Sequence, residues 1–229
     1  MIKNSLFGFD LIRFYLWKTE IQRLLFAPVM FGFLLLLART IYTGQLTFLF
    51  LVWNLFLAFV PYFLSYTLTH RSSWIENKRK FALVFTVWLL FIPNSFYVIT
   101  DLFHLYDSSE MPRWYDLLLI FCFAWNALLL GIMSVRHMEK ILQGVWPRCP
   151  AWLLVFPIML LNAAGIYIGR VLRYNSWDIL VNPFHLLADS FHILMHPLQY
   201  KDAWAMVWVF SFFLSMIYIT LKKLSRSFH

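Results

Sequence analysis

The sequence predicts an all-α membrane protein, a polytopic helical bundle with about six transmembrane helices, and three observations support this prediction. Hydrophobic residues make up 62% of the 229 residues and charged residues only 13%, against roughly 45–50% and 25% in soluble domains. Six apolar runs are long enough to cross a hydrocarbon core, which takes about 20 helical residues. The Lys and Arg residues lie mainly in the segments that flank these runs, where they set the orientation of a membrane protein.

The chain begins with a segment that is too charged to be a membrane span. In residues 3–20 the charged side chains fall on one side of a helix and the Phe, Ile and Leu side chains on the other. This pattern is typical of an amphipathic helix that lies in the membrane interface. The first 23 residues lack the apolar core of a cleavable signal peptide. We therefore expect an interfacial helix over 3–20, and expect the first span to direct insertion.

The six predicted spans follow in order and end in aromatic residues that suit the membrane interface. They lie near 24–43, 46–69, 81–100, 114–135, 151–169 and 203–221. The longest connection, 170–202, is the only one large enough to hold a structure of its own. No repeat, low-complexity tract or Gly/Ser linker divides the chain, so we expect a single transmembrane domain over 1–229.

The distribution of basic residues predicts the orientation. Five of the 19 Lys and Arg residues fall on one side of the predicted spans, namely Arg39, Arg113, Arg170, Arg173 and Lys201. The rest fall on the other side, so the positive-inside rule places both termini in the cytoplasm and the 170–202 loop on the outer face of the cell inner membrane. The net charge of +8 therefore reflects topology, and nucleic-acid binding has no support. Cys122 and Cys149 are not expected to form a disulfide or a metal site.

The third span ends in polar residues at helical spacing. Within IPNSFYVITDLFHL, residues 92–105, the residues Asn94, Tyr97, Asp101 and His104 follow i, i+3, i+7, i+10. This spacing puts all four on one helix face that rises towards the outer surface. Pro93 removes one backbone hydrogen bond and favours a kink at this point.

The fifth span leaves the membrane through two glycines and two arginines. Gly165 and Gly169, four residues apart, allow another helix to approach closely. Arg170 and Arg173, three residues apart, share a face and are suited to hold an anion or to pair with Asp101 or Asp178.

A helix predicted near 183–196 carries four further ionisable residues. His185, Asp189, His192 and His196 fall within roughly 60° of one another on one face, between a helix start at Asn182-Pro183 and a stop at Pro197. Neutral imidazoles and a carboxylate suit zinc or a similar divalent metal. The alternative is a water-facing stripe on an interfacial helix, and the sequence leaves both open. We expect this face to meet Asp101 and His104.

Spans two to five each carry one asparagine near the middle. These residues are Asn54, Asn94, Asn126 and Asn162. An amide in lipid seeks a partner inside the bundle, so we expect them to face inwards as a polar layer.

Two blocks of the sequence resemble a known family. The blocks PNSFYVITDLFHL (93–105) and GIYIGRVLRYNSWDILVNP (165–183) are similar to the signature blocks of an uncharacterised prokaryotic membrane-protein family, domain of unknown function thirteen-sixty-one. The resemblance implies a multi-span inner-membrane protein of prokaryotes. The family supplies no activity to carry over.

Two functions from different classes remain open, and whether the chain is an enzyme stays undecided. The first is a membrane-embedded hydrolase or transferase that acts on a lipid-linked or anionic substrate. Its candidate catalytic residues are Asp101, His104, Arg170, Arg173 and Asp178, and its candidate metal ligands are His185, Asp189, His192 and His196. The second is a non-catalytic membrane subunit, small transporter or assembly partner that uses the same face to dock another membrane protein.

Overall fold

The computed structural model describes residues 20–106, 111–174, 181 and 183–227, and the regular secondary structure of these residues is helical. In chain order the elements are α2 (Glu20–Thr43), α3 (Phe50–His70), α4 (Ser72–Glu76), α5 (Lys78–Tyr97), the 3-10 helix η1 (Val98–Tyr106), α6 (Arg113–Val145), α7 (Ala151–Arg170), α9 (Pro183–Met195) and α10 (Lys201–Ser227). The predicted interfacial helix over 3–20 lies almost wholly outside the described residues.

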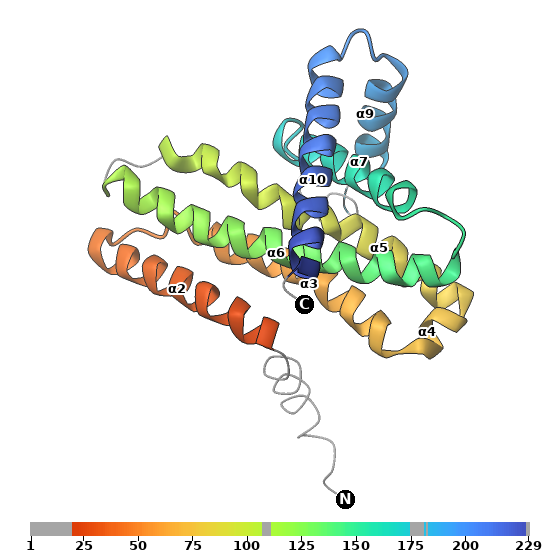
Figure 1. Cartoon of the computed structure of the whole chain (residues 1–229). Helices are drawn as coiled ribbons and strands as arrows, with labels where there is room; N and C mark the ends of the chain where they lie inside the picture. The colour runs from red at the N-terminus through yellow and green to blue at the C-terminus, as the bar shows by residue number, and fades with distance from the viewer. Residues whose placement is uncertain (1–19, 107–110, 175–180, 182, 228–229) are drawn as a thin grey trace, which may run out of the picture.

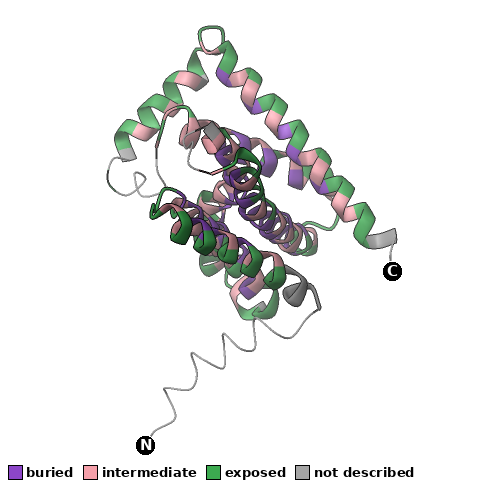
Figure 2. Cartoon of the chain, turned by 90° about the vertical axis from the view of Figure 1, so that its left-hand side faces the viewer, coloured by how far each residue is buried: buried purple, intermediate pink, exposed green. Residues whose placement is uncertain are grey.

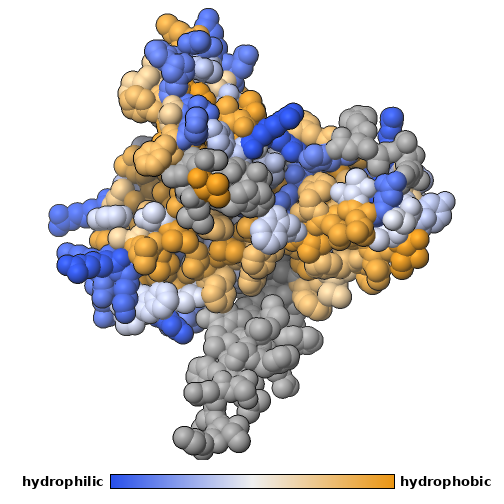
Figure 3. All heavy atoms as spheres, turned by 180° about the vertical axis from the view of Figure 1, so that it is seen from behind, coloured by the Kyte–Doolittle hydropathy of each residue, from blue (hydrophilic) through white to orange (hydrophobic). Residues whose placement is uncertain are grey.

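Six helical stretches of the described chain are long and apolar enough to cross a membrane, so the chain is a multi-pass membrane protein and the predicted helical bundle is confirmed. They are Phe26–Thr43, Phe50–His70, Lys78–Leu105, Arg113–Val145, Ala151–Arg170 and Lys201–Ser225. Each predicted span falls on one of them. Apolar side chains are prominent on the face of the bundle shown in Figure 3, as expected of a surface that meets lipid.

Two elements differ from the predicted bounds for identifiable reasons. The fourth span was expected to end near residue 135, but α6 continues to Val145. Its extra turns keep an apolar inward face, since Met138 and Leu142 are buried. The third span continues past its α-helix as η1, which carries Asp101 and His104. Pro93 lies inside α5 without ending it, which neighbouring helices make tolerable in a membrane.

Helix α6 is the centre of the bundle and lies between two apolar clusters. The first cluster joins α6 to α5, α7 and α10, with Trp88 and Ile166 fully buried. The second joins α6 to α2, α3 and η1, with Phe48 and Leu119 almost fully buried. Because α6 faces both clusters, it is the most buried of the six spans.

A buried ion pair fastens α2 to the start of α6. Nε of Arg39 lies 2.8 Å from Oδ1 of Asp116, and both side chains are 1% exposed. Beside it, the hydroxyl of Tyr115 donates a 2.7 Å hydrogen bond to the carbonyl of Leu35. We call this end of the bundle, which also holds Asp101, the Asp101 end.

The opposite end of the bundle holds a second buried carboxylate. Glu139 is 0% exposed and accepts hydrogen bonds from Arg136 on the same helix and from Tyr218 and Lys222 of α10. Three donors on one carboxylate fix the C-terminal part of α10 against α6. We call this end the Glu139 end.

Helix α9 and the first part of α10 form a hairpin that projects away from the other helices, and the rest of α10 runs back against the bundle (Figures 1 and 2). The indole Nε1 of Trp204 donates to the carbonyl of Ile193 at 3.2 Å, which ties α10 to α9. Helix α10 packs along α7, and α9 is mostly exposed (Figure 2). The predicted stop at Pro197 agrees with the end of α9 at Met195.

Candidate functional site

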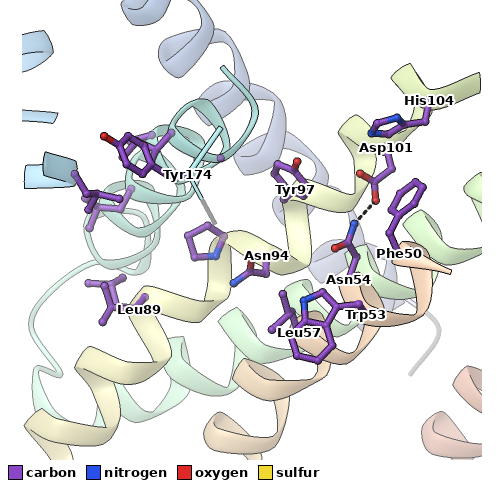
Figure 4. A pocket seen from close by; sticks show the side chains of 18 residues that line it. Phe50, Trp53, Asn54, Leu57, Leu89, Asn94, Tyr97, Asp101, His104 and Tyr174 are labelled. Atoms are coloured by element: carbon purple, nitrogen blue, oxygen red, sulfur yellow. Dashed lines mark hydrogen bonds between the residues drawn. The ribbon is translucent and has the colours of Figure 1, made fainter. Parts of the chain in front are cut away.

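A cavity of about 460 Å³ lies between α3, α5 and α7 (Figure 4). Its polar lining comes from the third span, where Asn94, Tyr97, Asp101 and His104 all face it, and from Asn54 of α3. The spacing of the first four residues predicted a common face. That face is retained although the α-helix changes to a 3-10 helix between Tyr97 and Asp101.

Asp101 is held from two sides at the polar end of this cavity. Its Oδ2 accepts a 2.8 Å hydrogen bond from Nδ2 of Asn54, drawn as a dashed line in Figure 4. Its Oδ1 lies 3.8 Å from Nη2 of Arg170. The carboxylate is only 1% exposed, so an amide and a guanidinium balance a charge that burial alone would penalise.

Arg170 gathers the other polar groups around itself. Nη1 lies 3.1 Å from Nε2 of His104 and 3.4 Å from the hydroxyl of Tyr97, and Nη2 donates to the carbonyl of Thr100. A guanidinium has only donors, so Nε2 of His104 accepts and the proton of the neutral ring lies on Nδ1. The guanidinium also lies 5.3 Å from the ring centroid of Tyr97, within cation–π range.

One donor of Arg170 has no partner in the described structure. Its Nε is buried and makes no hydrogen bond. A buried donor without a partner costs free energy, and functional sites are where such costs are commonly found. The side chain as a whole is 17% exposed. Nε of Arg170 can therefore donate one more hydrogen bond, to an oxygen atom of a ligand.

Close packing between α5 and α7 brings Arg170 to this place. A Cβ added to Gly165 would lie 2.6 Å from Cβ of Pro93, and one added to Gly169 would lie 3.1 Å from the ring of Tyr97. The two glycines predicted to allow close approach do so here, against the polar face of the third span. Since Arg170 follows directly, its position depends on that crossing.

The remainder of the cavity is apolar. Its walls are aliphatic and aromatic side chains from α3, α5, α7 and α9, namely Phe50, Trp53, Leu57, Leu89, Leu90, Leu161, Ile168 and Leu186. The cavity thus has a small polar end and a larger apolar part, the distribution that small-molecule sites commonly show.

The predicted site residues fall into three groups. Asp101, His104 and Arg170 are brought together. Arg173 is exposed just beyond α7 and does not line the cavity; its positive φ of 60° belongs to the turn that follows the helix. Asp178 lies outside the described residues.

The four residues proposed as metal ligands do not assemble. His185, Asp189, His192 and His196 are all exposed along and just beyond α9. Among the described residues there is no group of three or more His, Cys, Asp or Glu side chains that could hold a metal ion. The four side chains lie in a row along the exposed side of α9, and a metal site there stays a prediction.

Helix α9 reaches the cavity through other residues. Leu186 lines it, as does Tyr174, whose hydroxyl donates a 2.7 Å hydrogen bond to Oδ2 of Asp189. The rings of His192 and His196 lie 4.6 Å apart, and Nδ1 of His192 lies 3.2 Å from the hydroxyl of Tyr200. The expected meeting of the α9 polar stripe with Asp101 and His104 is thus replaced by a link through Tyr174.

The four central asparagines have different surroundings. Asn54 and Asn94 line the cavity, while Asn126 and Asn162 are fully buried in the bundle. The sequence predicted an inward polar layer of all four and did not identify Asn54 as the partner of Asp101. It also missed Glu139, although a Glu inside an apolar helical pattern was a usable signal.

One comparison identifies a family. The sequence model of a family described as "Protein of unknown function (DUF1361)" matches residues 53–217. Because this match covers well over half of the chain, the chain belongs to that family, and the resemblance noted in the two sequence blocks is confirmed. The match includes Asn54, Asp101, His104 and Arg170. Neither the comparison with curated proteins nor the comparison with solved structures found a match.

Proposed function

We propose that this member of the family binds the anionic head group of a lipid-linked molecule at Arg170, at the outer face of the inner membrane. The observation that carries the proposal is the buried Nε of Arg170, a donor without a partner. Arg170 is not itself a lining residue, but its guanidinium contacts Tyr97 and His104, which line the polar end of the cavity. Guanidinium groups bind phosphate and carboxylate oxygens more strongly than neutral donors do.

The charges around the cavity support an anionic ligand. Within the part of the chain that the structure describes, Asp101 is the one carboxylate that lines it, and Asn54 and Arg170 already occupy its two oxygens. Arg170 contributes a fixed positive charge beside the polar residues of the cavity. An anion at Nε of Arg170 would therefore meet donors and positive charge.

The outer-face assignment rests on the positive-inside rule. The loops and helix ends at the Glu139 end carry most of the Lys and Arg residues, and those at the Asp101 end carry few. This asymmetry supports an outer position for the Asp101 end and a cytoplasmic position for both termini.

The same residues can support hydrolysis or group transfer on the bound molecule. Nε2 of His104 carries a lone pair that is engaged by Arg170. An anion that draws the guanidinium towards itself would free this lone pair, and His104 could then take a proton from an attacking water or hydroxyl group. Asp101, fixed by Asn54, would hold Arg170 in register during that step.

A second function is favoured by a separate observation. Large apolar side chains of the α9 region stand free of the rest of the chain, with Phe184 84% and Leu198 81% exposed. Exposed apolar surface of this kind marks a contact with a membrane or another protein. Docking of a membrane-protein partner on α9 is therefore the alternative function.

Binding of phosphatidic acid tests the first proposal. Full-length protein in phosphatidylcholine nanodiscs is titrated with phosphatidic acid, and lipid binding is measured by native mass spectrometry. Arg170→Gln should weaken binding by about tenfold or more, as expected for a lost charged hydrogen bond of about 1.5–3 kcal/mol. The control Arg148→Gln changes an exposed arginine in the loop before α7 and should bind as the wild type does. Equal binding by all three proteins would contradict the proposal.

A further inference from the structure

We infer that the ligand of the Arg170 site is a membrane lipid whose hydrocarbon chain enters the cavity sideways from the bilayer, and not a soluble anion that enters from water. The inference rests on the proposed function. It adds the class of ligand and the route of entry, and three features of the cavity carry it.

The first feature is the exposure of the apolar wall. Trp53 of α3, Leu90 of α5 and Leu161 of α7 all line the cavity, and they are 48%, 45% and 50% exposed. All three lie within membrane-spanning stretches. A cavity whose walls are exposed at this depth opens to hydrocarbon, because water is absent from the bilayer core.

The second feature is the depth of the cavity. Leu161 precedes Arg170 by nine residues on α7, which corresponds to about 14 Å at the helical rise of 1.5 Å per residue. Half of a hydrocarbon core of about 30 Å is about 15 Å. The apolar wall thus extends from the polar residues about as far as one leaflet, which suits a lipid with its head group at Arg170 and its chain at Leu161.

The third feature is the protein cover that comes from outside the spans. Tyr174, from the segment after α7, and Leu186, from α9, line the cavity. The hydrogen bond from Tyr174 to Asp189 connects this segment to α9. The side towards water therefore carries protein, whereas the side towards α3, α5 and α7 offers exposed apolar residues.

The test blocks the apolar wall without changing the polar end. Leu161→Trp enlarges a side chain that lines the cavity. Its control, Leu153→Trp, enlarges a residue of the same helix that is 46% exposed but does not line the cavity. Leu90→Trp and its control Leu83→Trp repeat the comparison on α5. If one variant folds poorly, the other pair still tests the inference. Each protein is titrated in phosphatidylcholine nanodiscs with dioleoyl phosphatidic acid, dihexanoyl phosphatidic acid or inorganic phosphate.

Wild-type protein should bind the dioleoyl lipid more tightly than the dihexanoyl lipid, and inorganic phosphate most weakly. Leu161→Trp and Leu90→Trp should weaken dioleoyl binding by about tenfold, and both controls should bind as the wild type does. Equal affinity for dioleoyl lipid and inorganic phosphate, or dioleoyl binding untouched by both cavity variants, would overturn the inference.

The outcomes separate this inference from the proposed function. If inorganic phosphate binds as tightly as the dioleoyl lipid and Arg170→Gln abolishes both, the anion site stands and the lipid chain does not occupy the cavity. If none of the three probes binds in a way that depends on Arg170, the proposed function fails and the inference fails with it.

Discussion

Nδ2 of Asn54 donates a hydrogen bond of 2.8 Å to Oδ2 of Asp101. The bond joins the start of α3 to η1 and leaves the other oxygen of Asp101 facing Arg170. The amide of Asn54 therefore orients the carboxylate of Asp101, and this carboxylate in turn helps to position the guanidinium of Arg170.

Replacing Asn54 with leucine should destabilise the protein and disturb the site. The substitution keeps a similar volume but leaves a buried carboxylate oxygen without its donor, at a cost of about 1–3 kcal/mol. The measurement is the midpoint of thermal unfolding in detergent, together with phosphatidic acid affinity. The control is Asn126→Leu, whose amide donates to Cys122 of its own helix and whose Oδ1 has no partner. Asn126→Leu should be close to neutral, and an equal loss in both variants would contradict a special role for Asn54.

Enlarging Gly165 should separate α5 from α7. Alanine at this position would place its Cβ 2.6 Å from Pro93, and overpacking of this kind costs about 1–3 kcal/mol. Because α7 carries Arg170, phosphatidic acid affinity should fall together with the unfolding midpoint.

The control is Gly144→Ala near the end of α6, where an added Cβ meets nothing within 4 Å. It should raise stability by about 0.4–1 kcal/mol, since alanine reduces the freedom of the unfolded chain. Unchanged affinity in Gly165→Ala would show that the crossing does not position Arg170.

The arrangement of the third and fifth spans was accessible from sequence because it depends on local spacing. Asn94, Tyr97, Asp101 and His104 share a face in any right-handed helix of about this pitch, and the two glycines marked the surface on which α7 could approach it. The hydrogen bond between Asn54 and Asp101 could not be predicted from local spacing. It depends on how α3 is rotated against α5, and the sequence did not show which of the four asparagines would face Asp101.

The row of histidines on α9 shows what helical spacing alone does not predict. Helical spacing showed correctly that His185, Asp189, His192 and His196 lie along one side of a helix. It carried no information on which other element that side would meet. The side is exposed, because α9 contacts the cavity through Leu186.

Removing the charge of Glu139 should destabilise the bundle without affecting ligand binding. Glutamine would leave Arg136 and Lys222 facing a neutral group in a buried site, which costs about 3 kcal/mol for a broken pair of this kind. Phosphatidic acid affinity, measured at a temperature where the variant is folded, should stay at the wild-type value because Glu139 lies at the other end of α6. The control Glu76→Gln, at an exposed position, should change stability by less than about 0.5 kcal/mol. A large loss of affinity in Glu139→Gln would indicate coupling between the two ends.

The proposed orientation predicts which cysteines react in intact cells. Cys149 lies in the loop between α6 and α7, on the side assigned to the cytoplasm, and should react with a membrane-impermeant maleimide only after the cells are opened. Gln45→Cys, made together with Cys122→Ser and Cys149→Ser, places one thiol in the exposed loop between α2 and α3. This thiol should react in intact cells. The reverse pattern would place the Asp101 end in the cytoplasm and remove the outer-face assignment.

Cross-linking from the wall of the cavity tests the central claim most directly. A photoreactive benzoylphenylalanine replaces Trp53, an aromatic residue that already lines the cavity, or Leu83, an exposed residue of α5 that does not. After irradiation of cells, the attached molecules are identified by mass spectrometry. The account predicts an anionic lipid enriched at position 53, lost when Arg170→Gln is added, and a sample of the bulk lipids at position 83. The same lipid mixture at both positions, unchanged by Arg170→Gln, would contradict it.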